Sequence, residues 1–311
     1  MLFRTGAVGL IARRGERIRQ NRDHRSETIQ DPQKKGHLLR DLSHCTCTAR
    51  RLRSKLSGGF IMIITAETPV RDIAVELPTA IPLLERLAID YCCGGQHTLA
   101  EACAKRHLQL SPVLEELEHQ QEQNTKPSEN HWRQAPLKEL SEYIVQKHHA
   151  YTRDQLKLID SLMTKVEQRH GVDHPEVFQV SKVFAVISSE LTHHFDCEET
   201  TLFPYIAALG TEEQPELPAM AKNSMERPIT LMMMDHDQAG DELRTLRKLT
   251  SNYTTPPAAC ATWRALYRAM EDLELDLHQH IHLENNILFP RALEQAHIET
   301  QKRDSNSRQA A

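Results

Sequence analysis

An internal repeat in the second half of the chain constrains its fold more than any other feature of the sequence. The pattern is an acidic residue followed by His, Glu and Leu-Phe-Pro at steps of four residues, and it occurs twice, 86 residues apart. Its members are Glu190, His194, Glu198 and Leu202-Phe203-Pro204, and then Asp276, His280, Glu284 and Leu288-Phe289-Pro290. Residues four apart share one face of an α-helix, so each copy predicts a helix with a row of acid, imidazole and carboxylate.

A second match precedes each copy of the repeat. The residues His149, Asp154 and Leu156 correspond to His236, Asp241 and Leu243, 87 positions later. Each half is therefore predicted to be a helical hairpin, and an approximate two-fold axis is predicted to relate the halves. Four long segments near 136–170, 175–209, 228–252 and 257–295 show apolar residues at i, i+3 and i+4. Their modest loops favour an all-α, up-down-up-down four-helix bundle over residues 136–296.

The repeated histidines and glutamates are candidate metal ligands. They are His149, His194, Glu198, His236, His280 and Glu284. One His-x3-Glu motif is usually a solvated pair, but two copies with the same flanks and matched upstream histidines favour a metal site. Burying six polar groups without partners would cost several kcal/mol of folding free energy per group, roughly, and bound metal ions would remove that cost. Mixed imidazole and carboxylate ligands suit iron, manganese or zinc, and the two facing glutamates are placed to bridge two ions.

Other polar residues near the repeat are expected to support the candidate ligands or to lie at the surface. Glu190 and Asp276 lie one turn before the repeated histidines, so they are expected to accept hydrogen bonds from ligand N–H groups or to line a pocket. The neighbouring histidines are expected on other helix faces, as surface or rim groups; they are His148, His193, His278 and His282.

A pair of adjacent cysteines stands in the sequence DYCCGGQHTLA, within a predicted small helical domain at 67–122. A disulfide between Cys92 and Cys93 is disfavoured by the strained ring it would form. Thr98 starts a helix just after them, and a helix N-terminus lowers the pKa of a nearby thiol. One interpretation is a pair of reactive or iron-binding thiols; the alternative is two small packing residues. A polar linker is predicted at 123–135.

The ends of the chain are expected to lack a fold. Residues 1–61 contain fourteen Lys and Arg against five Asp and Glu, with no helical or strand period. We interpret them as an unstructured extension, with Met62 as an alternative start; a transit peptide or a nucleic-acid-binding tail fits less well. Residues 297–311 are predicted to be a disordered tail. No apolar run approaches the roughly 18 residues of a membrane helix. Without a signal peptide or disulfide framework, a cytoplasmic protein is expected.

The DYCCGG loop and the doubled His-x3-Glu-x3-Leu-Phe-Pro motif together resemble the RIC family (repair of iron centres) over about residues 67–296. The resemblance implies a hemerythrin-like bundle around a non-haem di-iron centre with the six ligands given above, bridged by Glu198 and Glu284. It also implies that Glu190 and Asp235 occupy acidic positions close to the di-iron centre. Asp235 is a shorter acid than the family pattern leads us to expect.

The family resemblance also implies a function. It predicts a cytoplasmic homodimer that restores iron-sulfur clusters damaged by nitric oxide or peroxide, with damaged iron-sulfur proteins as its clients. In this interpretation the centre donates iron, and Cys92 and Cys93 handle its transfer. The alternatives are an enzyme that reduces nitric oxide or oxidises a small substrate, and an oxygen carrier. The carrier hypothesis is weaker, because four histidines are fewer than oxygen-carrying hemerythrins use and a carrier has no need of adjacent cysteines. Neither nucleic acid nor a membrane is an expected partner.

Overall fold

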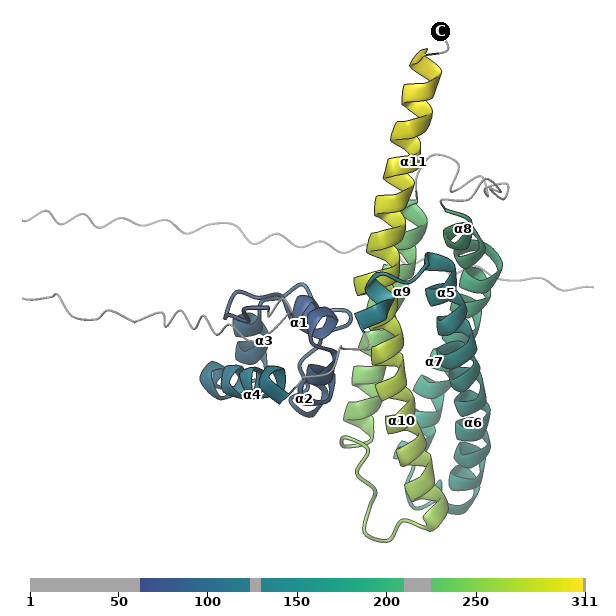
Figure 1. Cartoon of the computed structure of the whole chain (residues 1–311). Helices are drawn as coiled ribbons and strands as arrows, with labels where there is room; N and C mark the ends of the chain where they lie inside the picture. The colour runs from purple at the N-terminus through teal and green to yellow at the C-terminus, as the bar shows by residue number, and fades with distance from the viewer. Residues whose placement is uncertain (1–61, 124–129, 210–224, 310–311) are drawn as a thin grey trace, which may run out of the picture. The chain divides into compact units, whose positions relative to one another are not determined.

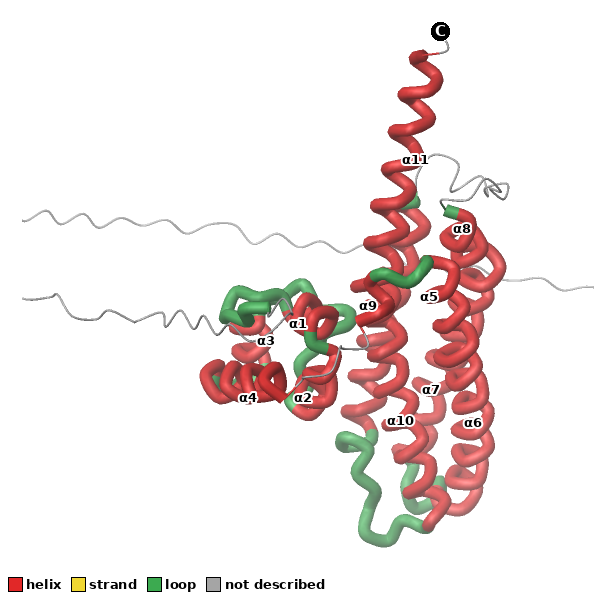
Figure 2. The backbone as a smooth tube through the Cα atoms, in the orientation of Figure 1, coloured by secondary structure: helices red, strands yellow, loops and turns green. Residues whose placement is uncertain are grey.

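The computed structural model describes residues 62–123, 130–209 and 225–309, and in these ranges its regular elements are helices (Figure 2). The one extended pairing in these ranges is an isolated bridge between Pro69 and Thr98. The all-α class predicted from the sequence is therefore confirmed. The predicted extension at 1–61 lies outside the described residues. In the described part, no helix combines the length and apolar character needed to cross a membrane.

Four short helices form the region before the bundle: α1 (Val70–Glu76), α2 (Ile81–Arg86), α3 (Leu99–Lys105) and α4 (Leu110–Gln123). Thr98 caps α3 as predicted: its hydroxyl accepts from the Glu101 N–H while the Glu101 carboxylate accepts from the Thr98 N–H. Apolar side chains from all four helices share one buried cluster, which includes Ile73, Leu84 and Leu117. This cluster holds the cysteine loop in place between α2 and α3.

Four long helical runs form the bundle (Figure 1). The first run joins α5 (Leu137–Tyr143) to α6 (Ala150–His170), and the second joins α7 (Glu176–Cys197) to α8 (Phe203–Ala208). The third is α9 (Glu226–Leu249), and the fourth joins α10 (Ala261–Leu283) to α11 (Phe289–Gln309). Helix α6 packs on α10 and α7, and α7 packs on α9. This is the up-down-up-down order predicted from the repeat.

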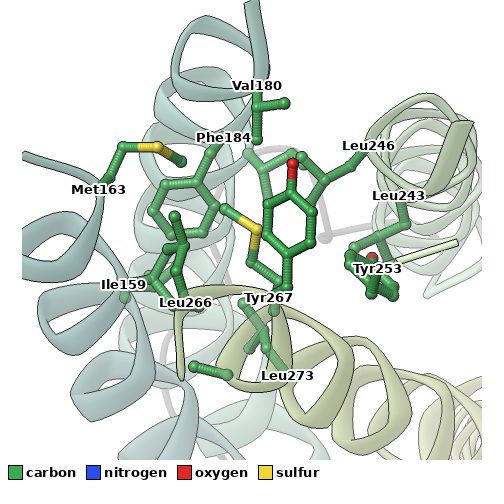
Figure 3. Close-up of a cluster of buried hydrophobic side chains, with 14 of the residues drawn as sticks. Ile159, Met163, Val180, Phe184, Leu243, Leu246, Tyr253, Leu266, Tyr267 and Leu273 are labelled. Carbon is green, nitrogen blue, oxygen red and sulfur yellow. The ribbon is translucent and has the colours of Figure 1, made fainter. Parts of the chain in front are cut away.

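Two apolar clusters stabilise the bundle. One lies among α6, α7, α9 and α10 and includes Met163, Phe184 and Leu266, whose side chains are drawn in Figure 3. The other lies among α5, α8, α9 and α11 and includes Ile206, Ile229 and Phe289. The repeated histidines and glutamates occur in the sequence between the residues of these clusters, so each cluster shields one side of a buried polar layer.

Three of the four runs contain a π-helical segment beside a repeated polar residue. These segments are η3 (Ile144–His149), η4 (Glu198–Leu202) and η5 (Glu284–Leu288). Segments η4 and η5 end just before the Phe-Pro pairs of the repeat, where proline lacks the N–H that an α-helix would use. The two prolines therefore follow widened turns within continuous helices. Single π-helical turns of this kind occur frequently at functional sites.

Three boundary predictions were wrong. The last helix continues to Gln309, so the residues from 297 to 309 are helical where a disordered tail was predicted. That stretch contains no proline or glycine after Pro290, and Glu, Gln, Lys and Arg favour the helix. The same run starts at Ala261 rather than at Pro257. Part of the predicted linker, Asn130–Arg133, forms a helical turn in which Trp132 packs on Tyr143 with ring centroids 4.3 Å apart.

Candidate metal centre

Six buried side chains meet in the polar layer of the bundle. They are the ones singled out by the repeat, and they form two groups: His149, Glu198, His280 and Glu284, and then His194, Glu198, His236 and Glu284. Within each group the potential ligand atoms all lie within 4.8 Å of one another. His149, Glu198 and Glu284 are each 0% exposed. Both glutamates belong to both groups, as the two-fold repeat predicts.

Each glutamate presents one oxygen to each group. Glu198 Oε1 lies 3.3 Å from His194 Nε2, and its Oε2 lies 3.4 Å from His149 Nε2. Glu284 Oε1 lies 2.9 Å from His280 Nε2, and its Oε2 lies 3.1 Å from His236 Nε2. Within the groups, the Nε2 atoms of the two histidines are 3.2 Å and 3.0 Å apart. Two imidazoles and two carboxylate oxygens therefore surround each of two adjacent positions.

This arrangement fits a pair of metal ions. Both oxygens of Glu198 are buried without a hydrogen-bond partner, which is costly for a carboxylate. Burial opposes ionisation of Glu284, but the imidazoles of His280 and His236 outweigh it and hold the pKa of Glu284 well below its ordinary value. Two ionised carboxylates and four imidazoles form a donor set typical of iron, manganese or zinc. The His and Glu groups therefore fit a di-iron centre.

The outer nitrogens of three histidines contact polar side chains, which fixes the ring orientation and directs Nε2 inward. His149 Nδ1 lies 2.7 Å from Glu199 Oε1, and His236 Nδ1 lies 2.9 Å from Asn285 Oδ1. His194 Nδ1 lies 3.4 Å from Asp235 Oδ2. The sequence analysis missed Glu199 and Asn285, although each directly follows a repeated glutamate. That equivalence in the repeat is the signal that would have identified them.

Two predicted acids take other partners. Glu190 accepts from Gln238 Nε2 at 3.0 Å with each oxygen, and Asp276 lies 3.1 Å from His148 Nδ1. His148 was expected at the surface or rim, but it is 1% exposed and stacks on His280 with ring centroids 5.6 Å apart. His282 is also buried, beneath Tyr91 of the cysteine loop region. Its burial lowers the pKa of His282 to about 4.

A cavity of about 350 Å³ opens onto the centre. Its lining includes three of the candidate ligands, His194, His236 and His280. Glu190, Asp235, Gln238 and Glu242 also line it, so the approach to the ligands carries carboxylates. Small ions and molecules can therefore reach the histidines from this side.

The cysteine loop lies against the helix that carries His236. Cys93 Sγ donates to the His236 carbonyl oxygen at 3.5 Å, and the Asn285 side-chain amide donates to the Cys92 carbonyl oxygen at 3.4 Å. The loop needs Gly95, because a Cβ there would lie 2.5 Å from the Tyr91 carbonyl oxygen. One prediction was wrong: the hydrogen bond with Cys93 and burial raise the pKa of the Cys92 thiol well above its ordinary value, where a lowered pKa was expected.

The fold and the site define a hemerythrin-like cation-binding bundle preceded by a small helical domain. Residues 140–292 match the family model of the hemerythrin HHE cation binding domain. Residues 66–121 match a second family model, described as a domain of unknown function, DUF542.

The chain is also similar to curated proteins. It is 39% identical over 228 residues to the iron-sulfur cluster repair protein YtfE of Escherichia coli O157:H7, covering 73% of this chain and 97% of that protein. The same identity and coverage hold for the protein of that name from Escherichia fergusonii. The chain therefore belongs to the RIC family, as its motifs indicated.

Proposed function

We propose that this protein repairs iron-sulfur clusters damaged by nitrosative or oxidative stress, and that it does so by supplying iron from a di-iron centre. The observation that carries the proposal is the pair of buried ligand groups that share Glu198 and Glu284. The relatives named iron-sulfur cluster repair proteins support the repair role. In this proposal His149 and His280 would hold one iron and His194 and His236 the other, and Glu198 and Glu284, which belong to both groups, would serve both irons.

The side chains of the centre have separable roles in this function. Both glutamates, which are fully buried, would supply charge to two cations. Glu199, Asp235 and Asn285 orient three of the histidines, and Glu190 and Asp235 line the cavity through which ions pass. A di-iron centre held here supplies exchangeable ferrous iron and redox capacity. Imidazole and carboxylate ligands release ferrous iron more readily than thiolates would, which suits a donor.

Reactivation of a damaged client tests the proposal. The iron-loaded protein is mixed anaerobically with a [4Fe–4S] dehydratase that nitric oxide has inactivated, and recovery of dehydratase activity is followed. We expect the wild-type protein to restore activity and a Glu198→Leu, Glu284→Leu protein to fail. Free ferrous iron at the same concentration is the control. Equal recovery with the double variant would contradict the proposal.

A second candidate function is reduction of nitric oxide or oxidation of a small substrate. The cavity of about 350 Å³ beside His194, His236 and His280 favours it, because it admits a small molecule to the centre. Consumption of nitric oxide by the purified protein with an electron donor distinguishes this activity from repair. Turnover without client reactivation would favour the enzyme.

The proposed setting is a reducing cytoplasm, with damaged iron-sulfur proteins as clients and a homodimer as the assembly. The cysteines of the described residues are all free, which agrees with a reducing compartment. Light scattering on the full chain tests the dimer, and affinity capture with damaged and intact client enzymes tests client binding.

A further inference from the structure

The two halves of the repeat differ in the side chains that contact the outer nitrogens of their equivalent histidines. His149 and His236 occupy equivalent positions of the repeat, as do Glu199 and Asn285. His149 Nδ1 therefore faces a carboxylate at 2.7 Å, whereas His236 Nδ1 faces the oxygen of a neutral amide at 2.9 Å. A carboxylate partner makes an imidazole a stronger metal ligand than an amide partner does.

The difference extends one residue further from the metal positions. Arg153 donates to Glu199 at 2.6 Å, and the position equivalent to Arg153 in the second half is Gly240. Arg244 and the cysteine loop border the space there: a Cβ on Gly240 would lie 3.4 Å from the Arg244 guanidinium and 3.6 Å from Cys93 Sγ. In the first half of the repeat, Arg153 forms an ion pair with Glu199. In the second half, the equivalent Asn285 instead donates a neutral hydrogen bond to the Cys92 carbonyl oxygen of the cysteine loop.

Access to the two positions is also unequal. The cavity lining includes both histidines of the second group, His194 and His236, but within the described residues it includes only His280 from the first. Its rim carries Glu190 and Glu242, whose carboxylates attract a departing cation and offer it oxygen ligands. An ion at the second position therefore has the open route, and its histidine His236 is held by a neutral amide where the matched His149 is held by a carboxylate. The remaining two histidines do not reverse the difference in access: His194 Nδ1 lies 3.4 Å from Asp235, which itself lines the cavity, and His280 Nδ1 is buried without a hydrogen-bond partner.

We infer that the iron held by His194 and His236 is the one released, and that Asn285 is the positioning residue that sets its release rate. This inference rests on the proposed role of the protein as an iron donor. Release would be a ligand exchange without a change of oxidation state: bonds to the nitrogens of His194 and His236 and to one oxygen each of Glu198 and Glu284 would be replaced by bonds to the acceptor, and the iron would remain ferrous. Asn285 also joins the Cys92 carbonyl to the His236 ring, so it links the loop to this position alone.

Chelator kinetics on the full chain test the inference. The protein is saturated anaerobically with Mössbauer-active ferrous iron and mixed with excess ferrozine, which forms a coloured ferrous complex. We expect half of the iron in a fast phase and half in a slow phase. Asn285→Asp keeps the acceptor and adds charge, so it slows the fast phase by about tenfold or more. Asn285→Ala removes the acceptor and speeds that phase. A merely structural role would make both variants speed release.

Glu199→Gln is the matched variant in the other half, and it is expected to speed only the slow phase. In the Mössbauer spectrum, Asn285→Asp is expected to change one of the two iron signals. Release of all iron in a single phase, acceleration by Asn285→Asp, or a response of the fast phase to Glu199→Gln would overturn the inference. Two-phase release with these responses, but without reactivation of a damaged dehydratase, would support the inference while refuting the proposed donor function.

Discussion

Replacement of Glu198, which belongs to both ligand groups, is predicted to abolish metal-dependent stabilisation of the whole centre. One Glu198 oxygen lies 3.3 Å from His194 Nε2 and the other lies 3.4 Å from His149 Nε2. His149 belongs to one group only. Glu198→Leu therefore removes a ligand from both metal positions, whereas His149→Ala removes a ligand from one.

The size of the effect follows from ligand linkage. Free ferrous iron at 100 times the dissociation constant stabilises the folded state by about 2.7 kcal/mol per site, or about 5.4 kcal/mol for two independent sites. For a bundle of this size, each kcal/mol raises the melting temperature by about 2–4 °C. The wild-type protein should therefore gain roughly 10–20 °C on iron loading, His149→Ala about half of that, and Glu198→Leu almost nothing.

Anaerobic differential scanning calorimetry measures these shifts. Each variant is compared with its own chelator-treated form, so that any change in the stability of the metal-free fold cancels. Elemental analysis of the same samples gives the iron content. A Glu198→Leu protein that keeps half of the wild-type shift and half of the iron would refute the bridging geometry, because one position would then hold its ion without Glu198.

Three further predictions concern cysteines and glycine. A hydrogen bond from His170 lowers the pKa of Cys260 to about 7, so its alkylation by iodoacetamide, followed by mass spectrometry, should rise between about pH 6 and 8 as the thiolate forms; Cys103 and Cys197, whose pKa burial raises, should need higher pH. Replacing Cys92 and Cys93 by Ser should leave the iron content intact and reduce client reactivation; loss of iron would instead make them ligands. Gly95→Ala should lower the free energy of unfolding by about 1–3 kcal/mol in denaturant titration, because its Cβ would lie 2.5 Å from the Tyr91 carbonyl oxygen; an unchanged value would contradict this loop geometry.

The bundle and its six central residues could be predicted from the sequence because these residues recur at regular spacings. Steps of four residues identify a helix face, and a repeat identifies two equivalent faces. His194 and Glu198, and likewise His280 and Glu284, lie together in the structure for this reason.

The same periodicity failed for the neighbours of these residues. We assumed that adjacent residues point to different faces, yet His148 and His149 are both buried, and Glu198 and Glu199 both contact His149. Both pairs lie at π-helical segments, where successive side chains do not follow α-helical directions. Burial of His282 has another cause, since Tyr91 of a distant segment covers it. Neither a local change of helix type nor contact with a distant segment is visible in a pattern of four-residue steps.

The π-helical segments η4 and η5 have a consequence for how the two apolar clusters are built. A π-helical turn is equivalent to one residue inserted into an α-helix, and one residue corresponds to a rotation of about 100°. In the second and fourth runs, the core-facing residues before the segment therefore do not share a register with those after it. The cluster around Phe184 and the cluster around Phe289 are thus built on two different helical registers. The metal-binding glutamates stand at the junction, where each begins its π-helical segment, so they mark the boundary between two separately specified cores.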